Sequence, residues 1–349
     1  MEITVGQRKE AEWHNHLGEV INELGKHQKA IGHYKKAIEI NPNHANAYNN
    51  LGNIFRKLKE FQKAADCFMR SATIHGNVHF LECTYLSNEL ENYKELLNTF
   101  AEKDPTNLRI AALSSYVSAK EGIKDVYPFC KSPLDYFFSI NLKDEFEFSD
   151  QFFKELLKVS EKLESSWQLK SIVKKGHQSL GNLLDKPFLE IIELKKKIES
   201  QISIYRENYK NSEDYYITRW PNESKLKGWY IKLKKQGQVT SHIHETGWLS
   251  GVFYLKVPEF LKRNEGSINL SLQGSDYPYD KNLPNLYYNP KPFDLILYPS
   301  SLFHYTVPFT SDGERHSIAF DVTPAIELKQ FKMNKEIRLV MKTMNEKDY

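Results

Sequence analysis

Two histidines separated by one residue are the first feature of this 349-residue chain that could perform chemistry. His242 and His244 lie in the segment VTSHIHETGWLSGVFYLKVPE, whose composition and pattern predict β-strands. Residues two apart on a strand project from the same face, so both imidazoles could reach one metal ion. His304, which follows the segment DLILYPSSLF, could supply a third ligand from a distant part of the chain. The spacing therefore predicts a site for one metal ion.

A cation follows this third histidine. Arg315 lies eleven residues beyond His304 and opens the strand-like segment RHSIAFDV. Iron oxygenases that use 2-oxoglutarate need two neighbouring ligands, a distant third ligand and open coordination positions. They also need a cation for the far carboxylate of the oxo-acid, and the planar fork of arginine suits that task. An isolated His-x-His pair is more often structural than metal-binding, but the four residues together favour a metal site.

The order of these motifs resembles the 2-oxoglutarate/Fe(II) oxygenases of the jelly-roll superfamily. The match consists of His-x-His, LSGVFYL, LILYPS, a later histidine and then an arginine, with VKKGHQSLGNLLD at its start. It spans residues 173–324. The resemblance implies Fe(II) as the metal and 2-oxoglutarate as the co-substrate. It makes His242 the first ligand, His304 the distal ligand and Arg315 the partner of the C5 carboxylate of 2-oxoglutarate.

The same resemblance implies roles for other side chains and a reaction. Tyr254, Ser250 and Tyr230 would line the co-substrate pocket, and no catalytic residue is expected beyond the metal ligands. Decarboxylation of 2-oxoglutarate would be coupled to hydroxylation of a C–H bond in a peptide, a protein or a small molecule. Helical repeats placed before such a domain are also similar to the architecture of aspartyl/asparaginyl β-hydroxylase.

His244 departs from the superfamily pattern, because most members have Asp or Glu at this position. The first interpretation is a site with three histidine ligands, since imidazole is a good ligand for Fe(II). The second is a site with two histidines, in which His244 hydrogen-bonds to the substrate or to a ligand. The third makes Glu245 the ligand, although a regular strand would point it to the opposite face. A neutral histidine leaves the metal centre one unit more positive.

Two other functions remain compatible with the sequence. One is a non-enzymatic repeat scaffold whose jelly roll binds a metal structurally, for which a closed site with four ligands would be expected. The other is a dioxygenase that uses three histidines without 2-oxoglutarate. Arg315 argues against this last function, because it would then have no purpose in the site.

The N-terminal part of the chain contains an internal repeat of 34 residues. Small and apolar residues recur at this offset, which lets antiparallel helices pack closely along a shared seam. The period resembles the tetratricopeptide repeat. A third, degenerate unit is expected from residue 80 to about residue 120, because such arrays need about three units. The related pairs are Leu17 and Leu51, Gly18 and Gly52, Ile21 and Phe55, Ala30 and Ala64, Tyr34 and Phe68, and Ala37 and Ser71.

Beyond the repeats, the pattern changes twice. Helices are predicted over residues 150–163 and 185–209, and the pattern changes to period two after residue 215. Short strands are predicted there over residues 229–233, 238–244, 249–257, 267–272, 293–298 and 316–323. We therefore predict an α+β fold, with tetratricopeptide-like helical repeats followed by a double-stranded β-helix (jelly-roll or cupin-like) and its packing helices. The expected domains are residues 1–123 for the repeats, 124–325 for the jelly roll, and 326–349 for a charged C-terminal tail or helix.

The composition restricts the classes of partner and the cellular compartment that we expect for the chain. Lysine and arginine (48) nearly balance aspartate and glutamate (45), which argues against a nucleic-acid or membrane partner. The sequence has no apolar run that could span a membrane and no signal-peptide core. Three widely spaced cysteines indicate a reducing compartment, so a cytoplasmic location is expected. The repeats favour a peptide or protein partner. The sequence is also compatible with a homo-oligomer.

Overall fold

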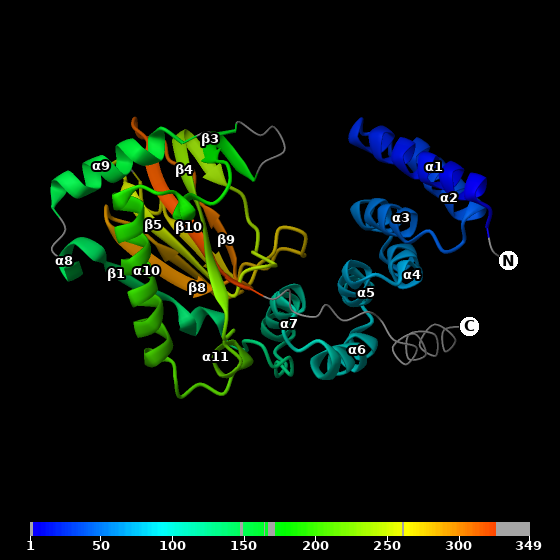
Figure 1. The fold of residues 1–349 in the computed structure, drawn as a ribbon. Helices are drawn as coiled ribbons and strands as arrows, with labels where there is room; N and C mark the ends of the chain where they lie inside the picture. The colour runs from blue at the N-terminus through cyan, green and yellow to red at the C-terminus, as the bar shows by residue number, and fades with distance from the viewer. Residues whose placement is uncertain (1–2, 147–148, 164, 167–171, 260–261, 326–349) are drawn as a thin grey trace. The chain divides into compact units, whose positions relative to one another are not determined.

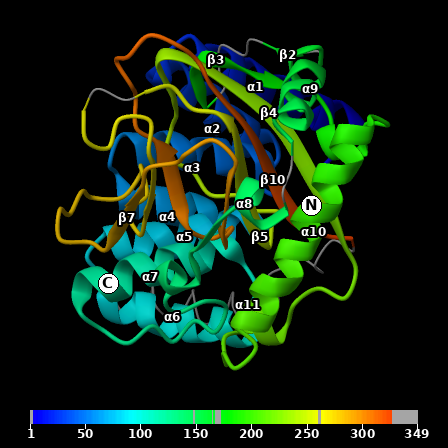
Figure 2. The same cartoon turned by 90° about the vertical axis from the view of Figure 1, so that its left-hand side faces the viewer.

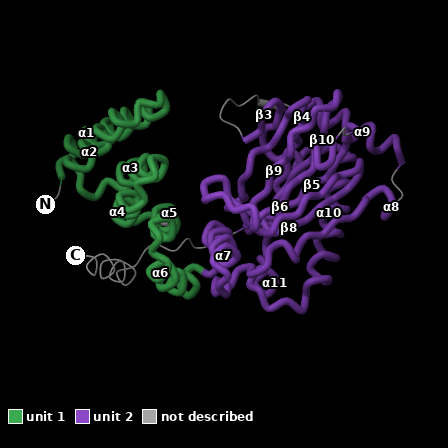
Figure 3. The backbone as a smooth tube through the Cα atoms, turned by 180° about the vertical axis from the view of Figure 1, so that it is seen from behind, with its two compact units in different colours: residues 1–104, 329–349 green, residues 105–328 purple. Residues whose placement is uncertain are grey.

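The computed structural model describes residues 3–146, 149–163, 165–166, 172–259 and 262–325. Within this part of the chain, two compact units divide between Asp104 and Pro105, as Figure 3 shows. By its contacts, the helix at residues 108–121 belongs to the second unit. The domain boundary near residue 123 stays a prediction, and the tail or helix expected at 326–349 lies outside the described residues.

The first unit consists of helices that pack against their neighbours in sequence. This arrangement confirms the prediction that the N-terminal region is helical. The third, degenerate unit begins earlier than residue 80, where the sequence pattern placed it, because the Thr73 side chain accepts a hydrogen bond from Gly76 N and caps the helix there. The described helices are α1 (Val5–Glu23), α2 (His27–Ile40), α3 (Ala45–Lys57), α4 (Phe61–Ser71), α5 (Ile74–Leu86) and α6 (Leu90–Lys103).

The 34-residue period corresponds to a repeated contact between a glycine and an aromatic ring. A Cβ atom on Gly18 would come within 2.6 Å of the Tyr34 ring, and one on Gly52 within 2.9 Å of the Phe68 ring. Both rings are buried, so each glycine is required for the close approach of the paired helices. The repeat found in the sequence is therefore also a repeat in the packing.

The second unit is built from two antiparallel sheets, and its arrangement confirms the predicted double-stranded β-helix (Figure 1). Strand β10 lies between β4 and β5 at the centre of the larger sheet. The larger sheet has the order β1 (Phe138–Asn141), β8 (Asp294–Pro299), β5 (Leu249–Lys256), β10 (Arg315–Pro324), β4 (Ser224–Val239), β3 (Val173–Ser179) and β2 (Ser165–Ser166); the smaller has the order β7 (Asn285–Tyr288), β6 (Ile268–Ser271) and β9 (Phe303–Thr306).

Helices accompany the sheets. Figures 1 and 2 show α10 along the face of the larger sheet, where Ile191, Leu194 and Ile198 are completely buried. This helix begins at Leu189 and not at Asp185, because residues 183–185 form a separate 3-10 turn ahead of Pro187. The other helices of this unit are α7 (Leu108–Glu121), α8 (Leu142–Phe146), α9 (Asp150–Glu161) and α11 (Tyr215–Thr218).

The apolar core of the second unit lies between the two sheets. Ile231, Val252 and Ile296 from the larger sheet belong to the same buried cluster as Ile268 and Leu270 from the smaller sheet. Side chains alternate along each strand, so the neighbours of these residues face the outer side of their sheet. The functional residues described below lie in a cavity that is lined partly by residues of this core.

Two predicted strands prove to be one. Strand β4 continues from Ser224 to Val239 through Gln236, whose φ of 59° bends the chain at the point where the sequence suggested a break. The strand ends before the histidine pair, so the expected strand over residues 238–244 is wrong. His242 forms only an isolated bridge with His304.

Candidate metal centre

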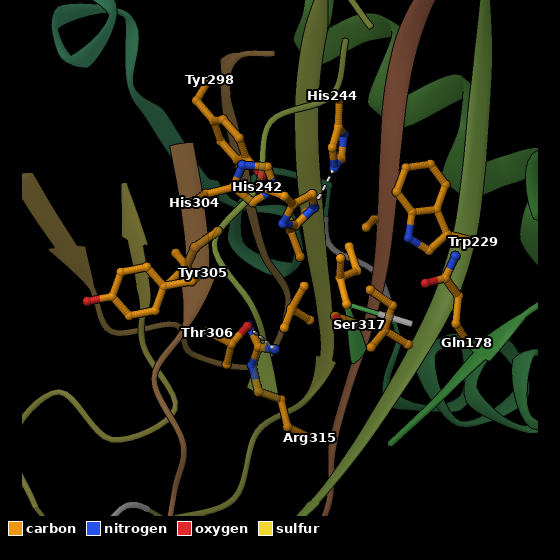
Figure 4. Close-up of a pocket in the computed structure, with 16 residues that line it drawn as sticks. Gln178, Trp229, His242, His244, Tyr298, His304, Tyr305, Thr306, Arg315 and Ser317 are labelled. Carbon is orange, nitrogen blue, oxygen red and sulfur yellow. Dashed lines mark hydrogen bonds between the residues drawn. The ribbon is translucent and has the colours of Figure 1, made fainter. Parts of the chain in front are cut away.

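Backbone pairing brings the predicted histidines together. His242 N donates to His304 O over 3.2 Å, and His304 N donates to His242 O over 3.0 Å. His244 N donates to Ser300 O at 3.1 Å, which fixes the chain beyond the bridge. Figure 4 shows the three imidazoles gathered at one end of the cavity. One ring nitrogen of each histidine lies within 4.8 Å of the other two.

The hydrogen bonds of the three rings determine which nitrogen is free. His242 Nδ1 lies 2.7 Å from Thr240 O, His304 Nδ1 lies 3.1 Å from Leu302 O, and His244 Nδ1 lies 2.6 Å from Asp321 Oδ1. Carbonyl and carboxylate oxygens only accept, so each Nδ1 carries the hydrogen and each Nε2 keeps its lone pair. This tautomer is the one that binds a metal through Nε2.

The distance between two of these nitrogens fits a shared ion. His242 Nε2 and His244 Nε2 lie 2.9 Å apart. Two lone pairs at this distance repel each other unless a cation lies between them. Nitrogens about 2.1 Å from one ion, at a right angle, would be about 3 Å apart. The donor set therefore suits a divalent metal bound by imidazole.

Burial keeps two of the rings neutral. Desolvation, together with the neighbouring His244, lowers the pKa of His242 to about 4. Burial, together with the nearby His242 and His244, holds the pKa of His304 well below its usual value. Neutral imidazole is the form that binds metal, so both rings can act as ligands at neutral pH without first losing a proton.

Asp321 was not identified from the sequence as part of the site. Its carboxylate is buried on β10, where it accepts from His244 Nδ1 and, at 2.7 Å, from the Ser250 hydroxyl. Asp321 lies six residues after Arg315, so the strand period of two already placed both side chains on one face. The negative charge that a carboxylate ligand would supply is thus present one hydrogen bond away from the metal position.

Arg315 lies in the same cavity as the histidines and is 3% exposed. Its guanidinium is 4.8 Å from the centre of the Tyr254 ring and donates from Nη1 to Thr306 Oγ1 over 3.4 Å. Among the described residues, no carboxylate pairs with it, and its Nε has no hydrogen-bond partner. A buried cation without an anion is costly. The cavity between Arg315 and the histidines is therefore suited to a carboxylate.

The other predicted site residues fall into two groups. Tyr254 lies under the Arg315 guanidinium, and Ser250 holds Asp321. Tyr230 requires a correction, because it faces the other side of β4, where its hydroxyl lies 2.5 Å from His316 Nδ1. The sequence suggested a pocket role for Tyr230 without resolving which face of the strand it occupies. Trp229 and Ile231, its neighbours on β4, line the cavity instead.

Glu245, the alternative ligand, is turned toward helix α7. Its carboxylate pairs with Arg109 at 2.9 Å and is 48% exposed. It is therefore not directed at the three imidazoles in this structure.

A second cluster of potential ligands lies on the outer side of β10. Glu161, Glu314 and His316 offer ligand atoms within 4.8 Å of one another. Lys232 pairs with Glu161 at 3.3 Å and with Glu314 at 2.9 Å. The positive charge that a metal would supply is already provided by this lysine. We refer to these four residues as the outer cluster.

Comparisons of the sequence with known families agree with this geometry. Residues 227–321 match the family described as "Putative 2OG-Fe(II) oxygenase", and residues 9–75 match the tetratricopeptide repeat. No curated protein matches the chain.

Solved structures that are similar to the chain share little sequence with it. HygX from Streptomyces hygroscopicus, solved with nickel and 2-oxoglutarate bound, is 13% identical over 54% of this chain and 83% of its own, with a TM-score of 0.38. A prolyl-4-hydroxylase from Pseudomonas putida is 11% identical over 54% and 93%, with a TM-score of 0.39. A prolyl hydroxylase from Trichoplax adhaerens, in complex with a hypoxia inducible factor peptide fragment, is 15% identical over 61% and 89%, with a TM-score of 0.38.

The family match and the metal centre together define the class. The second unit contains a 2OG-Fe(II) oxygenase domain, and tetratricopeptide repeats precede it. The chain is a 2-oxoglutarate-dependent non-haem iron oxygenase that uses Fe(II) and 2-oxoglutarate, as the sequence predicted. Among the described residues, no helix is both long and apolar enough to cross a membrane.

Proposed function

We propose that this chain is a hydroxylase whose Fe(II) is held by the Nε2 atoms of His242, His244 and His304. The observation that supports the assignment is that an oxygen engages each Nδ1, which leaves each Nε2 free, in a cluster whose ligand nitrogens lie within 4.8 Å of one another. Bound Fe(II), with O2 and 2-oxoglutarate, supplies the oxidising power for C–H hydroxylation as 2-oxoglutarate becomes succinate and CO2.

Arg315 would bind the C5 carboxylate of 2-oxoglutarate. Its guanidinium is buried in the same cavity as the histidines, and Thr306 offers a hydroxyl beside it. The Tyr254 ring lies beneath the guanidinium and fixes its plane. Ile231 and Val252 line the wall and exclude water, which strengthens a charge-assisted hydrogen bond between arginine and carboxylate.

His244 would be the third ligand and not a substrate contact. Asp321 holds its Nδ1 and aims its Nε2 at the Nε2 of His242. The pair of Asp321 and His244 has the form of the carboxylate–histidine pairs that orient metal ligands. One alternative is a centre with two histidines, in which Arg315 would keep its role. The other is a structural metal site, which would leave the unpaired charge of Arg315 unexplained.

We propose a peptide or protein as the substrate, recognised through the repeat unit. Repeats of this kind form extended concave surfaces that hold peptides. We also propose the cytoplasm as the compartment, because Cys67, Cys83 and Cys130 are buried free thiols.

Anaerobic reconstitution with Fe(II), followed by titration with 2-oxoglutarate, tests the assignment. We expect a charge-transfer absorption band that saturates with 2-oxoglutarate and is absent from Arg315→Ala at the same concentrations. A saturating band of unchanged affinity in Arg315→Ala would contradict the role of the arginine. Failure of the wild type to bind Fe(II) would favour the scaffold function.

The substrate class is tested separately by succinate formation. Peptide mixtures should raise turnover of 2-oxoglutarate above its substrate-free rate, whereas mixtures of small metabolites should not. The opposite result would reject the peptide while leaving the metal centre in place.

A further inference from the structure

A second cavity lies on the other side of the smaller sheet from the metal centre. On β9, His304, Tyr305 and Thr306 all border the metal cavity. Side chains alternate along the strand, so the rings of Phe303 and Tyr305 project to the face opposite His304 and Thr306. Figure 4 shows the Tyr305 ring extending away from the histidines. A cavity of about 280 Å³ opens there, against Tyr305 and the loop of residues 273–283. We call it the tyrosine pocket.

The floor of the tyrosine pocket is a row of three side chains. Asn269 on β6 lies opposite Tyr287 on β7 and opposite Tyr305 on β9. The hydroxyls of the two tyrosines lie 3.3 Å apart. Ile268 and Leu270, which flank Asn269 in sequence, belong to the apolar core, so the amide of Asn269 faces the pocket.

Two polar atoms of the pocket lining lack partners among the described residues. Asn269 is 2% exposed, and its Nδ2 has no hydrogen-bond partner among the described residues. The buried Oγ of Ser241, which also lines the pocket, is likewise without a partner in the described part of the chain. Buried polar groups are almost always hydrogen-bonded, so these two atoms are placed to contact something that enters the pocket.

The wall of the pocket is formed before any ligand arrives. The Gln273 side chain donates to Gly274 O at 2.8 Å and accepts from Asp280 N at 3.0 Å, which ties the loop to itself. Tyr116 on α7 donates from its hydroxyl to Pro278 O at 2.9 Å and supports the loop from outside. A preformed wall reduces the entropy lost on binding.

The chemistry of the lining identifies the class of ligand. Most lining side chains carry a hydroxyl, an amide or a tyrosine ring, and Leu283 is the one aliphatic side chain among the described lining residues. Asp280 and Lys281 contribute opposite charges, so the pocket favours a neutral ligand. Tyrosine faces pack against C–H surfaces, while amides and hydroxyls exchange hydrogen bonds with ligand hydroxyls.

The strand pairing argues against an extended peptide in the tyrosine pocket. Strand β6, at the centre of the floor, is paired on both sides, so a peptide that entered the pocket could not pair with β6 as an added strand. The volume is just below the range of about 300–1,000 Å³ that holds drug-sized ligands. We infer that the tyrosine pocket binds a neutral sugar or cyclic polyol of monosaccharide size. This inference does not rest on the proposed oxygenase activity.

Saturation-transfer NMR on the full chain, with a panel of neutral monosaccharides and inositols, tests the inference. We expect at least one member to bind saturably, with its C–H protons receiving magnetisation from the protein. Asn269→Leu keeps the side-chain volume and removes the amide, so it should weaken binding by about tenfold or more. Tyr287→Phe should weaken binding in the same direction and serves if Asn269→Leu does not fold.

Tyr288→Phe is the matched control. Tyr288 is the next residue on β7, and its hydroxyl donates to Asp294 at 2.8 Å outside the pocket. Its loss should leave sugar binding unchanged. The inference is overturned if no neutral sugar or polyol binds saturably, since the pocket then holds only water. It is also overturned if only sugar phosphates or peptides bind, or if Tyr287→Phe binds as tightly as the wild type.

Discussion

Strand β10 carries a cluster of potential metal ligands on each of its faces, and the two clusters differ in how their charges are arranged. On the inner face, Asp321 holds His244 beside His242 and His304. On the outer face, His316 lies with Glu161 and Glu314. Both clusters bring three ligand atoms within 4.8 Å, so proximity alone does not distinguish them.

The difference lies in the hydrogen bonds and in the charge already present. In the outer cluster, Lys232 pairs with both carboxylates, and both ring nitrogens of His316 have polar partners, the Tyr230 hydroxyl and the Glu314 carboxylate. In the metal centre, each Nδ1 is engaged by an oxygen and each Nε2 keeps its lone pair, with those of His242 and His244 only 2.9 Å apart. A metal site therefore requires lone pairs that converge and a missing positive charge, whereas the outer cluster is complete without an ion.

Removing one histidine from each cluster should give the largest contrast. We expect His304→Ala to weaken binding of Co(II) or Fe(II) by more than about a hundredfold, beyond the loss typical of an outer partner of a ligand. His316→Ala should leave metal affinity unchanged. Calorimetric titration of the two variants would check this, with circular dichroism as the control for folding. Equal losses in both variants would remove the distinction between the clusters.

The second prediction concerns Arg315, the buried cation at the start of β10. Arg315→Ala should lower the affinity for 2-oxoglutarate by more than about a hundredfold, because an unpaired buried carboxylate costs about 3–5 kcal/mol. Arg315→Lys should weaken it less, since lysine keeps the charge but loses the planar fork. Titration of metal-loaded protein measures both, with Arg219→Ala as a control at an arginine stacked on Tyr215. Unchanged affinity would point to a dioxygenase without 2-oxoglutarate.

A smaller effect is expected at the carboxylate that holds His244. Asp321→Asn keeps an oxygen that can accept from His244 Nδ1 but removes the negative charge. We expect metal affinity to fall by about 10–100-fold. Ser250→Ala, which removes one hydrogen bond to the carboxylate, should have a weaker effect in the same direction. Co(II) absorption spectra would report the changed ligand field, and an unaltered spectrum with unaltered affinity in Asp321→Asn would show that the carboxylate only fills space.

The smallest effect is expected in the outer cluster and depends on pH. Burial alone would raise the pKa of Glu314, but the Lys232 ammonium outweighs it and holds the pKa below its usual value. Ionised Glu314 therefore stabilises the folded state above its ordinary pKa, and this contribution disappears as the pH falls through the lower, folded value. Glu314→Gln should cost less than about 1 kcal/mol at pH 7, because the pair is partly exposed. Thermal melts should converge at acidic pH, and a constant difference across pH would contradict the ionic origin.

The sequence predicted the parts of this fold whose signals are periodic. The recurrence of Gly18 at Gly52 located the repeats, and alternation located β5, β6, β8 and β10. The His-x-His pair, His304 and Arg315 were found because residue type and spacing together are rare outside metal chemistry. The structure brings these four side chains into one cavity.

Other features depend on contacts that spacing does not encode. Asp321 is one of many acidic residues in the sequence, and only its hydrogen bonds with Ser250 and His244 distinguish it. Tyr230 was assigned to the wrong face because a local pattern did not resolve which of two buried faces borders the cavity. Strands β7 and β9 were not predicted, because Tyr287 with Tyr288, and His304 with Tyr305, place polar groups on both faces and obscure the alternation that β6 shows in Ile268–Ser271.

The repeated contact of glycine with an aromatic ring has a consequence for the length of the helical array. Each 34-residue segment carries both the glycine and the ring that packs on it, at Gly18 and Tyr34 and again at Gly52 and Phe68. A duplicated copy of residues 9–42 would therefore bring its own complete packing contact with it. The array can therefore grow by whole units. Insertion of a 34-residue unit would lengthen the helical array without changing the sequence of any existing helix.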